Sequence, residues 1–312
     1  MKRSLVQMHL AVLLWGFTAV LGRAISLDAP VLVWYRMLMT AAIMAAILTY
    51  RKLWVKIDRR DLWQLILIGG LISLHWVGFY GTVKYANASI ALVCLSTASV
   101  FTSLLDPLVN KGKYDLFEVL LGLLALCGVY LIYRFQQFFG IGILFGIIAA
   151  ILSSVFTVLN KRIAYKYPAR TMVFYEMTTG WLFITMLLPL QFVFFPATRF
   201  MPYADDLFSS HWFHNDWLWL IILSLCCTVW AQSLALTALK KLSSFTVTLS
   251  VNLEPVYGIL LAFFFYHENK QLHNGFFIGM GLILLSVVLQ MVRLLRPAKT
   301  APGYIEQKGG LD

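Results

Sequence analysis

Apolar residues gather in long stretches that are separated by short polar connections. Each stretch spans about 20 residues, and a helix of that length, rising about 1.5 Å per residue, crosses a hydrocarbon core roughly 30 Å thick. The pattern therefore predicts an all-α polytopic membrane protein with ten transmembrane helices. The predicted spans cover residues 5–24, 31–50, 62–84, 88–109, 115–134, 139–160, 170–195, 215–239, 243–266 and 272–292.

The positive charges of the connections fall mainly on one side of the predicted membrane. An even number of spans puts both termini on one side, and 19 of the 25 Lys and Arg residues lie on that side. Because short cytoplasmic loops are enriched in Lys and Arg, we expect a multi-pass protein of the cell (inner) membrane with cytoplasmic termini. The net charge of +11 is spread over alternate loops, which argues against a nucleic-acid partner.

Two segments of the chain look non-membranous. Residues 196–214 form a predicted outer loop, in which His211, His214 and nearby acids have a spacing that can bind a metal. A solvated loop is favoured, because no second shell or catalytic context accompanies the pair. Residues 297–312 form a polar tail predicted to be disordered in the cytoplasm. We predict no metal and no cofactor.

The two halves of the chain resemble each other. Residues 33–37 (VWYRM) open the second span, and residues 173–177 (VFYEM) open the seventh. In spans five and ten an acid precedes two glycines at equal spacing, namely Asp115, Gly122 and Gly128 against Glu268, Gly275 and Gly281. Five helices per half would insert the two copies in opposite orientations. The sequence therefore predicts two inverted five-helix repeats, residues 1–138 and 139–296.

Five short motifs extend this picture over most of the chain. They are Trp15-Gly16, the spacing from Pro30 to Arg36, Lys84-Tyr85, Glu254-Pro255, and the acid-then-glycine spacing that leads into span ten. In these motifs the chain resembles the drug/metabolite transporter superfamily in its ten-helix EamA form. The resemblance implies a carrier that moves small organic metabolites by alternating access and often exports amino acids or related compounds. Asp106-Pro107 lies later in its span than Glu254-Pro255 does, so we do not expect these two pairs to be equivalent.

Glu254 is the most central ionisable residue of the predicted spans. It shares one helical face with other polar side chains: Ser243, Thr246, Ser250 and Tyr257. Pro255 removes a backbone donor and leaves the carbonyl group of Val251 without its helical partner. A carboxyl group that only packs against a neighbouring helix is the alternative, but a polar stripe with a break favours a wet cavity.

Other polar residues of the spans are candidates for the same cavity. Serines on span four can serve a substrate or equally allow close helix packing, and His75 can relay protons or pair with a hydroxyl group, the interpretation we slightly favour. Ser153, Thr157 and Asn160 are compatible with a pathway but not diagnostic. The candidate cavity residues are Glu254, Tyr257, Ser250, Asn252, His75, Trp76, Tyr80, Ser96, Ser99, Gln232 and Trp15.

Three charged residues are candidates for anchoring or gating: Arg36, Glu176 and Asp106. Arg36 and Glu176 occupy the same place in the two similar pentapeptides. In inverted repeats they would lie toward opposite sides of the membrane, too far apart in depth to pair.

These features predict a secondary transporter, and more specifically an exporter of amino acids or amphipathic drug-like compounds through a central cavity. Its partners would be the substrate and membrane lipid, as a monomer or a homodimer. The alternatives are an intramembrane enzyme or a non-transporting membrane sensor. The spans contain no catalytic motif and the chain contains no Gly-x-x-x-x-Gly-Lys-Ser/Thr loop, which argues against an enzyme and against ATP-driven transport.

Overall fold

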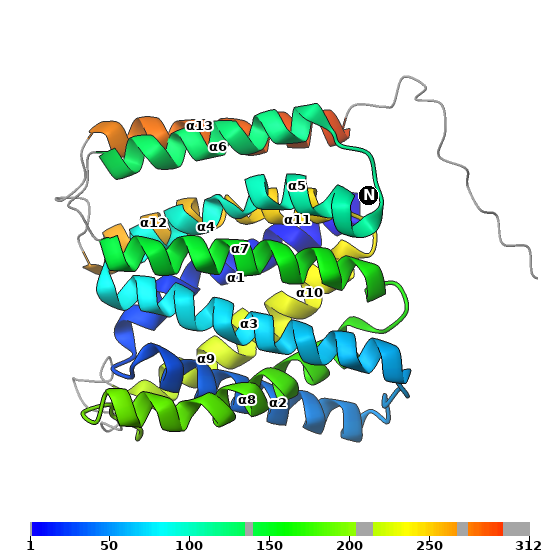
Figure 1. Cartoon of the computed structure of the whole chain (residues 1–312), viewed down its shortest axis with the longest axis vertical. Helices are drawn as coiled ribbons and strands as arrows, with labels where there is room; N and C mark the ends of the chain where they lie inside the picture. Colours follow the sequence, from blue (N-terminus) through cyan, green and yellow to red (C-terminus); the bar gives the residue numbers. More distant parts are fainter. Residues whose placement is uncertain (1, 135–139, 204–214, 267–273, 296–312) are drawn as a thin grey trace, which may run out of the picture.

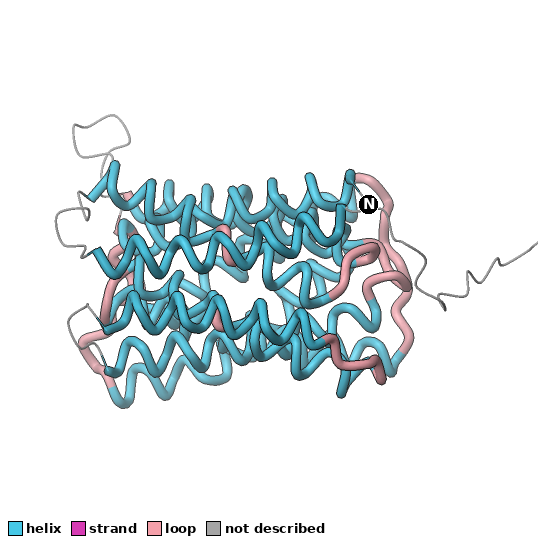
Figure 2. Tube along the Cα trace, turned by 90° about the horizontal axis from the view of Figure 1, so that it is seen from above, coloured by secondary structure: helices cyan, strands magenta, loops and turns pink. Residues whose placement is uncertain are grey.

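The computed structural model describes residues 2–134, 140–203, 215–266 and 274–295, and these residues form helices and their connections. The chain crosses the bundle ten times, which confirms the predicted all-α fold. Figure 2 shows that the helices run along one direction, with the connections gathered at the two ends. The predicted outer loop that contains His211 and His214, together with Glu268 and the predicted disordered tail, lies outside the described residues.

The helices of the first half are α1 (Lys2–Ala24), α2 (Ala29–Tyr50), α3 (Arg59–Tyr85), α4 (Ala88–Ser96), α5 (Ala98–Asn110) and α6 (Leu116–Arg134). Those of the second half are α7 (Gly140–Ile163), α8 (Ala169–Phe194), α9 (Asp216–Ser224), the π-helix η2 (Leu225–Trp230), α10 (Ala231–Leu239), α11 (Ser244–Val251), α12 (Glu254–Tyr266) and α13 (Asn274–Leu295). Three crossings are interrupted: α4 with α5, α9 to α10 through η2, and α11 with α12. Within the described residues, seven crossings are long and apolar enough to span a membrane, and α6 and α13 contain shorter apolar stretches. The predicted ends differ from the observed ends by at most three residues.

Large apolar side chains cover the outside of the bundle as well as its interior. Exposed examples come from helices all around it: Leu13, Leu67, Leu144, Leu182 and Leu260. Contiguous apolar surface of this extent is unfavourable in water. In a bilayer such a surface is expected, because it contacts apolar lipid tails instead of water.

The two halves are inverted with respect to each other. The N-terminus and the end of α13 lie at one end of the bundle, which we call the terminal face, and the other end is the opposite face (Figure 1). Helix α1 begins at the terminal face, whereas α7, five crossings later, begins at the opposite face. The contacts follow the same symmetry: α3 packs on α7 and α8, while α10 packs on α1 and α9 packs on α2.

Local features repeat between the halves at the two similar pentapeptides. Trp34 and Tyr35 form an edge-on aromatic pair with ring centroids 4.9 Å apart, at the sixth and seventh positions of α2. Phe174 and Tyr175 form the same arrangement at 5.2 Å, at the sixth and seventh positions of α8.

The fourth crossing of each half is interrupted near the middle of the bundle. Helix α4 ends at Ser96 and α5 begins after Thr97, whereas α11 ends at Val251 and α12 begins at Glu254. Pro255 is the second residue of α12, where the backbone N–H group that proline lacks would have no acceptor within the helix. The break predicted around this proline is therefore present.

Helices α6 and α13 pack chiefly on each other at one edge of the bundle (Figure 1). A Cβ atom added at Gly128 would lie 2.5 Å from the carbonyl oxygen of Gly279. The glycines therefore allow these two helices to approach closely within one chain.

Candidate functional site

A cavity of about 90 Å³ lies in the centre of the bundle, between the two repeats. Helices α1 to α4 supply one part of its wall, and α7, α10, α11 and α12 supply the other. The residues that line it are Trp15, Thr18, Arg36, His75, Trp76, Phe79, Leu95, Ser153, Phe156, Thr157, Asn160, Gln232, Ala235, Leu236, Leu239, Val247, Thr248, Val251 and Glu254. Leu239 is the last residue of α10 and Val247 the fourth of α11, so the cavity extends from the centre toward the terminal face.

The structure brings six of the predicted residues together in this wall: Trp15, Arg36, His75, Trp76, Gln232 and Glu254. They come from five different crossings and from both repeats. Trp15 donates its indole N–H to the carbonyl oxygen of Cys227 at 3.1 Å, which fixes its ring against the third crossing of the second repeat.

Arg36 is a buried cation with 2% of its surface exposed. Its guanidinium group lies over the Trp76 ring, with Cζ 3.7 Å from the ring centroid. Nε donates to the hydroxyl group of Thr228 at 2.9 Å, Nη1 to the hydroxyl group of Tyr80 at 2.8 Å, and Nη2 to the carbonyl oxygen of Cys227 at 3.3 Å. Arg36 forms no ion pair with any acid among the described residues. Because a guanidinium group has five N–H donors, one remains on each terminal nitrogen.

The π-helix η2 explains how this arginine is held. A π-helical turn places an additional residue in the turn and is frequent at functional sites. Here the hydroxyl group of Thr228 donates to the carbonyl oxygen of Leu223, five residues earlier, at 3.0 Å. The carbonyl group of Cys227 accepts from both Trp15 and Arg36. The π-helix η2 therefore supplies two of the three hydrogen-bond acceptors of Arg36, the Thr228 hydroxyl group and the Cys227 carbonyl group.

Glu254 begins α12 and is 4% exposed. Its Oε1 atom lies 3.2 Å from the hydroxyl group of Thr18, which also lies 2.7 Å from the carbonyl oxygen of Trp15. A hydroxyl group has one proton, so it serves one of these two acceptors at a time. Glu254 therefore has little fixed hydrogen bonding and remains open to a ligand in the cavity.

His75 is held by the backbone rather than by the hydroxyl group that we had expected. Its Nδ1 atom donates to the carbonyl oxygen of Ala149 at 2.7 Å, and its ring packs edge-on against Phe156 at a centroid distance of 5.3 Å. A carbonyl group only accepts, so Nδ1 carries the proton.

Glu176 lies behind the cavity wall and is fully buried. The amide side chains of Gln232 and Asn160, both in the wall, are its polar neighbours, but neither carboxyl oxygen accepts a well-aligned hydrogen bond from the described residues. Arg36 and Glu176 form no ion pair, in line with their predicted separation.

The remaining candidates of the predicted cavity lie outside the described wall. Three serines donate to carbonyl groups of their own crossings: Ser96 to Leu92, Ser99 to Ser96 and Ser250 to Thr246. Asn252, at the break between α11 and α12, donates to Ser99 at 3.3 Å. Tyr80 holds Arg36, and Tyr257 packs where Gly16 of α1 approaches α12.

Asp106 lies near the terminal face, where α5 meets the start of α11. It accepts a hydrogen bond from Ser244 at 3.2 Å and another from Asn110 in its own helix. These contacts place it outside the cavity wall and are compatible with the predicted anchoring role.

Several wall residues could not be found by sequence reasoning. Thr18, Phe79, Phe156 and Thr248 carry no signal that separates them from ordinary residues of a membrane helix. The serine–threonine–asparagine face of α7 was compatible with a pathway, and the structure places Ser153, Thr157 and Asn160 in the wall. Within the described ranges, no group of three or more His, Cys, Asp or Glu side chains has the arrangement of a metal site.

Two inverted repeats of membrane helices around a central cavity with buried charged side chains are the construction of a membrane transporter. Comparison with known proteins agrees: residues 3–134 and residues 140–292 each match the EamA-like transporter family. The chain belongs to the EamA-like transporter family.

Its relatives are similar over most of their lengths. A protein of Synechocystis named an uncharacterized transporter is 24% identical, over 78% of this chain and 69% of that one. Another of that name, from Archaeoglobus fulgidus, is 25% identical over 83% of this chain and 85% of its own. A solved crystal structure shares the fold, with a TM-score of 0.69 and 17% identity over 95% of this chain and 99% of that chain.

Proposed function

We propose that this transporter is a secondary carrier that exports small metabolites bearing both a carboxylate and an ammonium group, such as amino acids. The observation that supports this most is that one cavity contains both a buried guanidinium group, that of Arg36, and a buried carboxyl group, that of Glu254. Charged groups inside a membrane are costly and are retained where they serve a pathway or a ligand.

The free donors of Arg36 fit a carboxylate. One N–H on each terminal nitrogen is left over, which is the pattern needed for a bidentate contact with two carboxylate oxygens. Stacking on Trp76 and the bond to Tyr80 hold the fork in one orientation, so little side-chain entropy is lost when a ligand binds.

Glu254 and the apolar wall would receive the rest of such a ligand. The Glu254 carboxyl group can accept from an ammonium group, and Phe79, Phe156 and Leu236 offer apolar surface to a side chain. The cavity volume of about 90 Å³ accommodates a small molecule in this conformation. Access from the two faces in turn, driven by an ion gradient or by exchange, would move it across the membrane.

The proposed orientation supports export. The 19-to-5 division of positive charges favours a cytoplasmic terminal face. The cavity extends toward that face, where an exported metabolite would enter.

Exchange of labelled amino acids by the purified protein in liposomes tests this proposal. Competition by an amino acid is compared with that by its deaminated acid and by its decarboxylated amine. We expect each analogue to compete at least about tenfold less well, because it leaves one buried charge without a partner. Equal competition by all three would contradict a site for both groups.

The Arg36→Lys variant, which keeps the charge but loses the fork, is expected to raise the KM of amino acids by roughly tenfold. The matched control is Arg199→Lys, since Arg199 also lies over an aromatic ring, Tyr203, but at the end of the bundle away from the cavity. An unchanged KM in the folded Arg36→Lys variant would contradict the assignment of the carboxylate to Arg36.

A further inference from the structure

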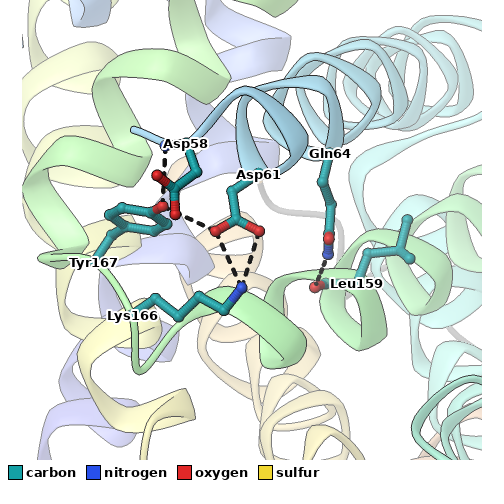
Figure 3. A network of polar contacts seen from close by, with 6 residues as sticks. All are labelled: Asp58, Asp61, Gln64, Leu159, Lys166 and Tyr167. Carbon is teal, nitrogen blue, oxygen red and sulfur yellow. Dashed lines mark hydrogen bonds and ion pairs between the residues drawn. The ribbon is translucent and has the colours of Figure 1, made fainter. Parts of the chain in front are cut away.

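A polar cluster at the terminal face ties the two repeats together (Figure 3). Both oxygens of Asp61, in the first turn of α3, lie close to Nζ of Lys166, at 3.0 and 3.1 Å. The hydroxyl group of Tyr167 donates to the same carboxylate at 2.8 Å and accepts from the backbone N–H of Asp58 at 3.2 Å. Lys166 and Tyr167 belong to the connection between α7 and α8. The cluster therefore joins the third crossing of the first repeat to the first connection of the second.

A second cluster at the opposite face makes the reciprocal connection. Asp216, in the first turn of α9, accepts from the backbone N–H of Ser26 at 2.7 Å and from its hydroxyl group at 2.5 Å. It also accepts from the backbone N–H of Tyr203 at 2.8 Å. Ser26 belongs to the connection between α1 and α2. This cluster therefore joins the third crossing of the second repeat to the first connection of the first.

The two clusters are equivalent under the inverted repeat. Ser26 lies three residues before the start of α2, and Lys166 lies three residues before the start of α8. Each binds an aspartate in the first turn of the third crossing of the other repeat. Asp61 is 4% exposed and Asp216 is 1% exposed, so both carboxylates are shielded from water that would weaken their bonds.

We propose that these clusters are two reciprocal latches of the transport cycle, one at each face of the cavity. The terminal latch consists of Asp61, Lys166 and Tyr167, and the opposite latch consists of Asp216 and Ser26. Residues of the latches position the repeats and do not touch the substrate. The proposal rests on the alternating access that we propose for this carrier, and it is independent of the substrate class.

The position of the latches explains why opening one would favour closing the other. Each latch spans the boundary between the repeats at one end of the bundle, and the cavity lies between them. When the repeats rock about this cavity, separating them at one face presses them together at the other. Both latches are formed in the present structure, and each step of the cycle then breaks one of them.

Side-specific labelling of the cavity measures which face is open. The reporter is Ser153→Cys, in the cavity wall, placed in a variant whose four natural cysteines are replaced by alanine. A membrane-impermeant thiol reagent is added to either face of oriented proteoliposomes. The ratio of the two labelling rates reports the balance between the two open states and requires no substrate.

We expect Asp61→Asn to raise labelling from the terminal face relative to the opposite face by roughly tenfold, since hydrogen bonds to charged groups are lost there. Asp216→Asn should shift the ratio by a similar factor in the other direction. The double variant should return toward the parent ratio, a compensation that two purely structural defects would not produce. Lys166→Gln should shift the labelling ratio in the same direction as Asp61→Asn, and Ser26→Ala in the same direction as Asp216→Asn, both by smaller factors.

Asp115→Asn is the matched control. Asp115 also forms an ion pair between the repeats at the terminal face, to Arg293 of α13 at 2.5 Å, but between helices that stand at the edge of the bundle. Its loss should leave the labelling ratio unchanged.

Folding of every variant is checked by size-exclusion chromatography. Where an aspartate variant does not fold, the single variant Lys166→Gln or Ser26→Ala of the same latch decides the outcome. Shifts in the same direction, or no shift in folded variants, would overturn the latches. If the labelling shifts as expected while amino acids fail to exchange, the latches stand and the proposed substrate class falls.

Discussion

Burying an arginine among membrane helices is unfavourable unless its charge and its donors are met, and the surroundings of Arg36 meet only part of that need. Trp76 offers a ring face, and Thr228, Tyr80 and Cys227 take three of the five N–H groups. Two N–H groups are left without an acceptor among the described residues, and Glu254 lies in the same cavity without forming an ion pair to Arg36. We propose that a ligand supplies the missing acceptors.

Glu254→Gln is expected to insert and fold but to lose most gradient-driven transport. The amide keeps the shape of the side chain and can still accept from Thr18, whereas it cannot ionise. Transport is measured in liposomes with and without a proton gradient. Glu176→Gln is the companion variant, because Glu176 is equally buried but lies behind the wall. Transport by Glu254→Gln that keeps the parent rate and pH dependence would reduce Glu254 to a structural residue.

At this scale the sequence identified charged and aromatic wall residues better than hydroxyl residues. An ionisable or aromatic side chain deep in an apolar span, such as Arg36, Trp76 or Glu254, has few reasons to be there. A serine has an alternative partner in the carbonyl group one turn earlier, and Ser250 takes that alternative. Helical periodicity alone cannot decide between the two.

At the scale of the elements, close packing between helices depends on single glycines. A Cβ atom at Gly69 of α3 would lie 2.1 Å from the hydroxyl oxygen of Thr179 and 2.5 Å from the carbonyl oxygen of Glu176. At the adjacent Gly70 the nearest atoms, those of Phe183, would be 3.8 Å away. The two neighbours thus differ sharply in their tolerance of a side chain.

We therefore expect Gly69→Ala to destabilise the protein by about 1–3 kcal/mol, the usual cost of overpacking. Gly70→Ala should be neutral or stabilising by up to about 1 kcal/mol, because alanine favours helix over glycine. Thermal unfolding of both variants in the same detergent compares them. Equal melting temperatures would contradict the close α3–α8 contact.

The ends of the helices were predictable and most of their interruptions were not. Hydropathy predicts where a span leaves the membrane, and Pro255 predicted the break before α12. The break at Thr97 and the π-helix at Leu225–Trp230 contain no proline or glycine. They depend on partners in other helices, such as Asn252 for Ser99 and Arg36 for Thr228, which the local sequence does not reveal.

At the scale of the whole molecule, the inverted repeat was predictable from the sequence because two similar pentapeptides lie at the same positions of α2 and α8. The pairing of α3 with α7 and of α10 with α1 was not visible, since it requires the two halves to be assembled. The location of the cavity follows from that assembly rather than from any single span.

The orientation of the molecule gives a further expectation. Val55 lies in the exposed connection at the terminal face, and Ala197 lies in the exposed connection at the opposite face. In intact cells, an impermeant thiol reagent should label Ala197→Cys and spare Val55→Cys, both in the cysteine-free background. The reverse pattern would contradict the cytoplasmic placement of the terminal face.

The π-helix also has a consequence for comparing this chain with its relatives. A π turn holds one residue more than an α turn closing the same helical path, so Leu225–Trp230 carries a residue in surplus. A homologue that lacks this residue would still complete the crossing, but it would lose the widened turn whose carbonyl group holds Trp15 and Arg36. A one-residue gap at this point of an alignment would therefore mark the loss of the contacts that hold Trp15 and Arg36 in the cavity wall.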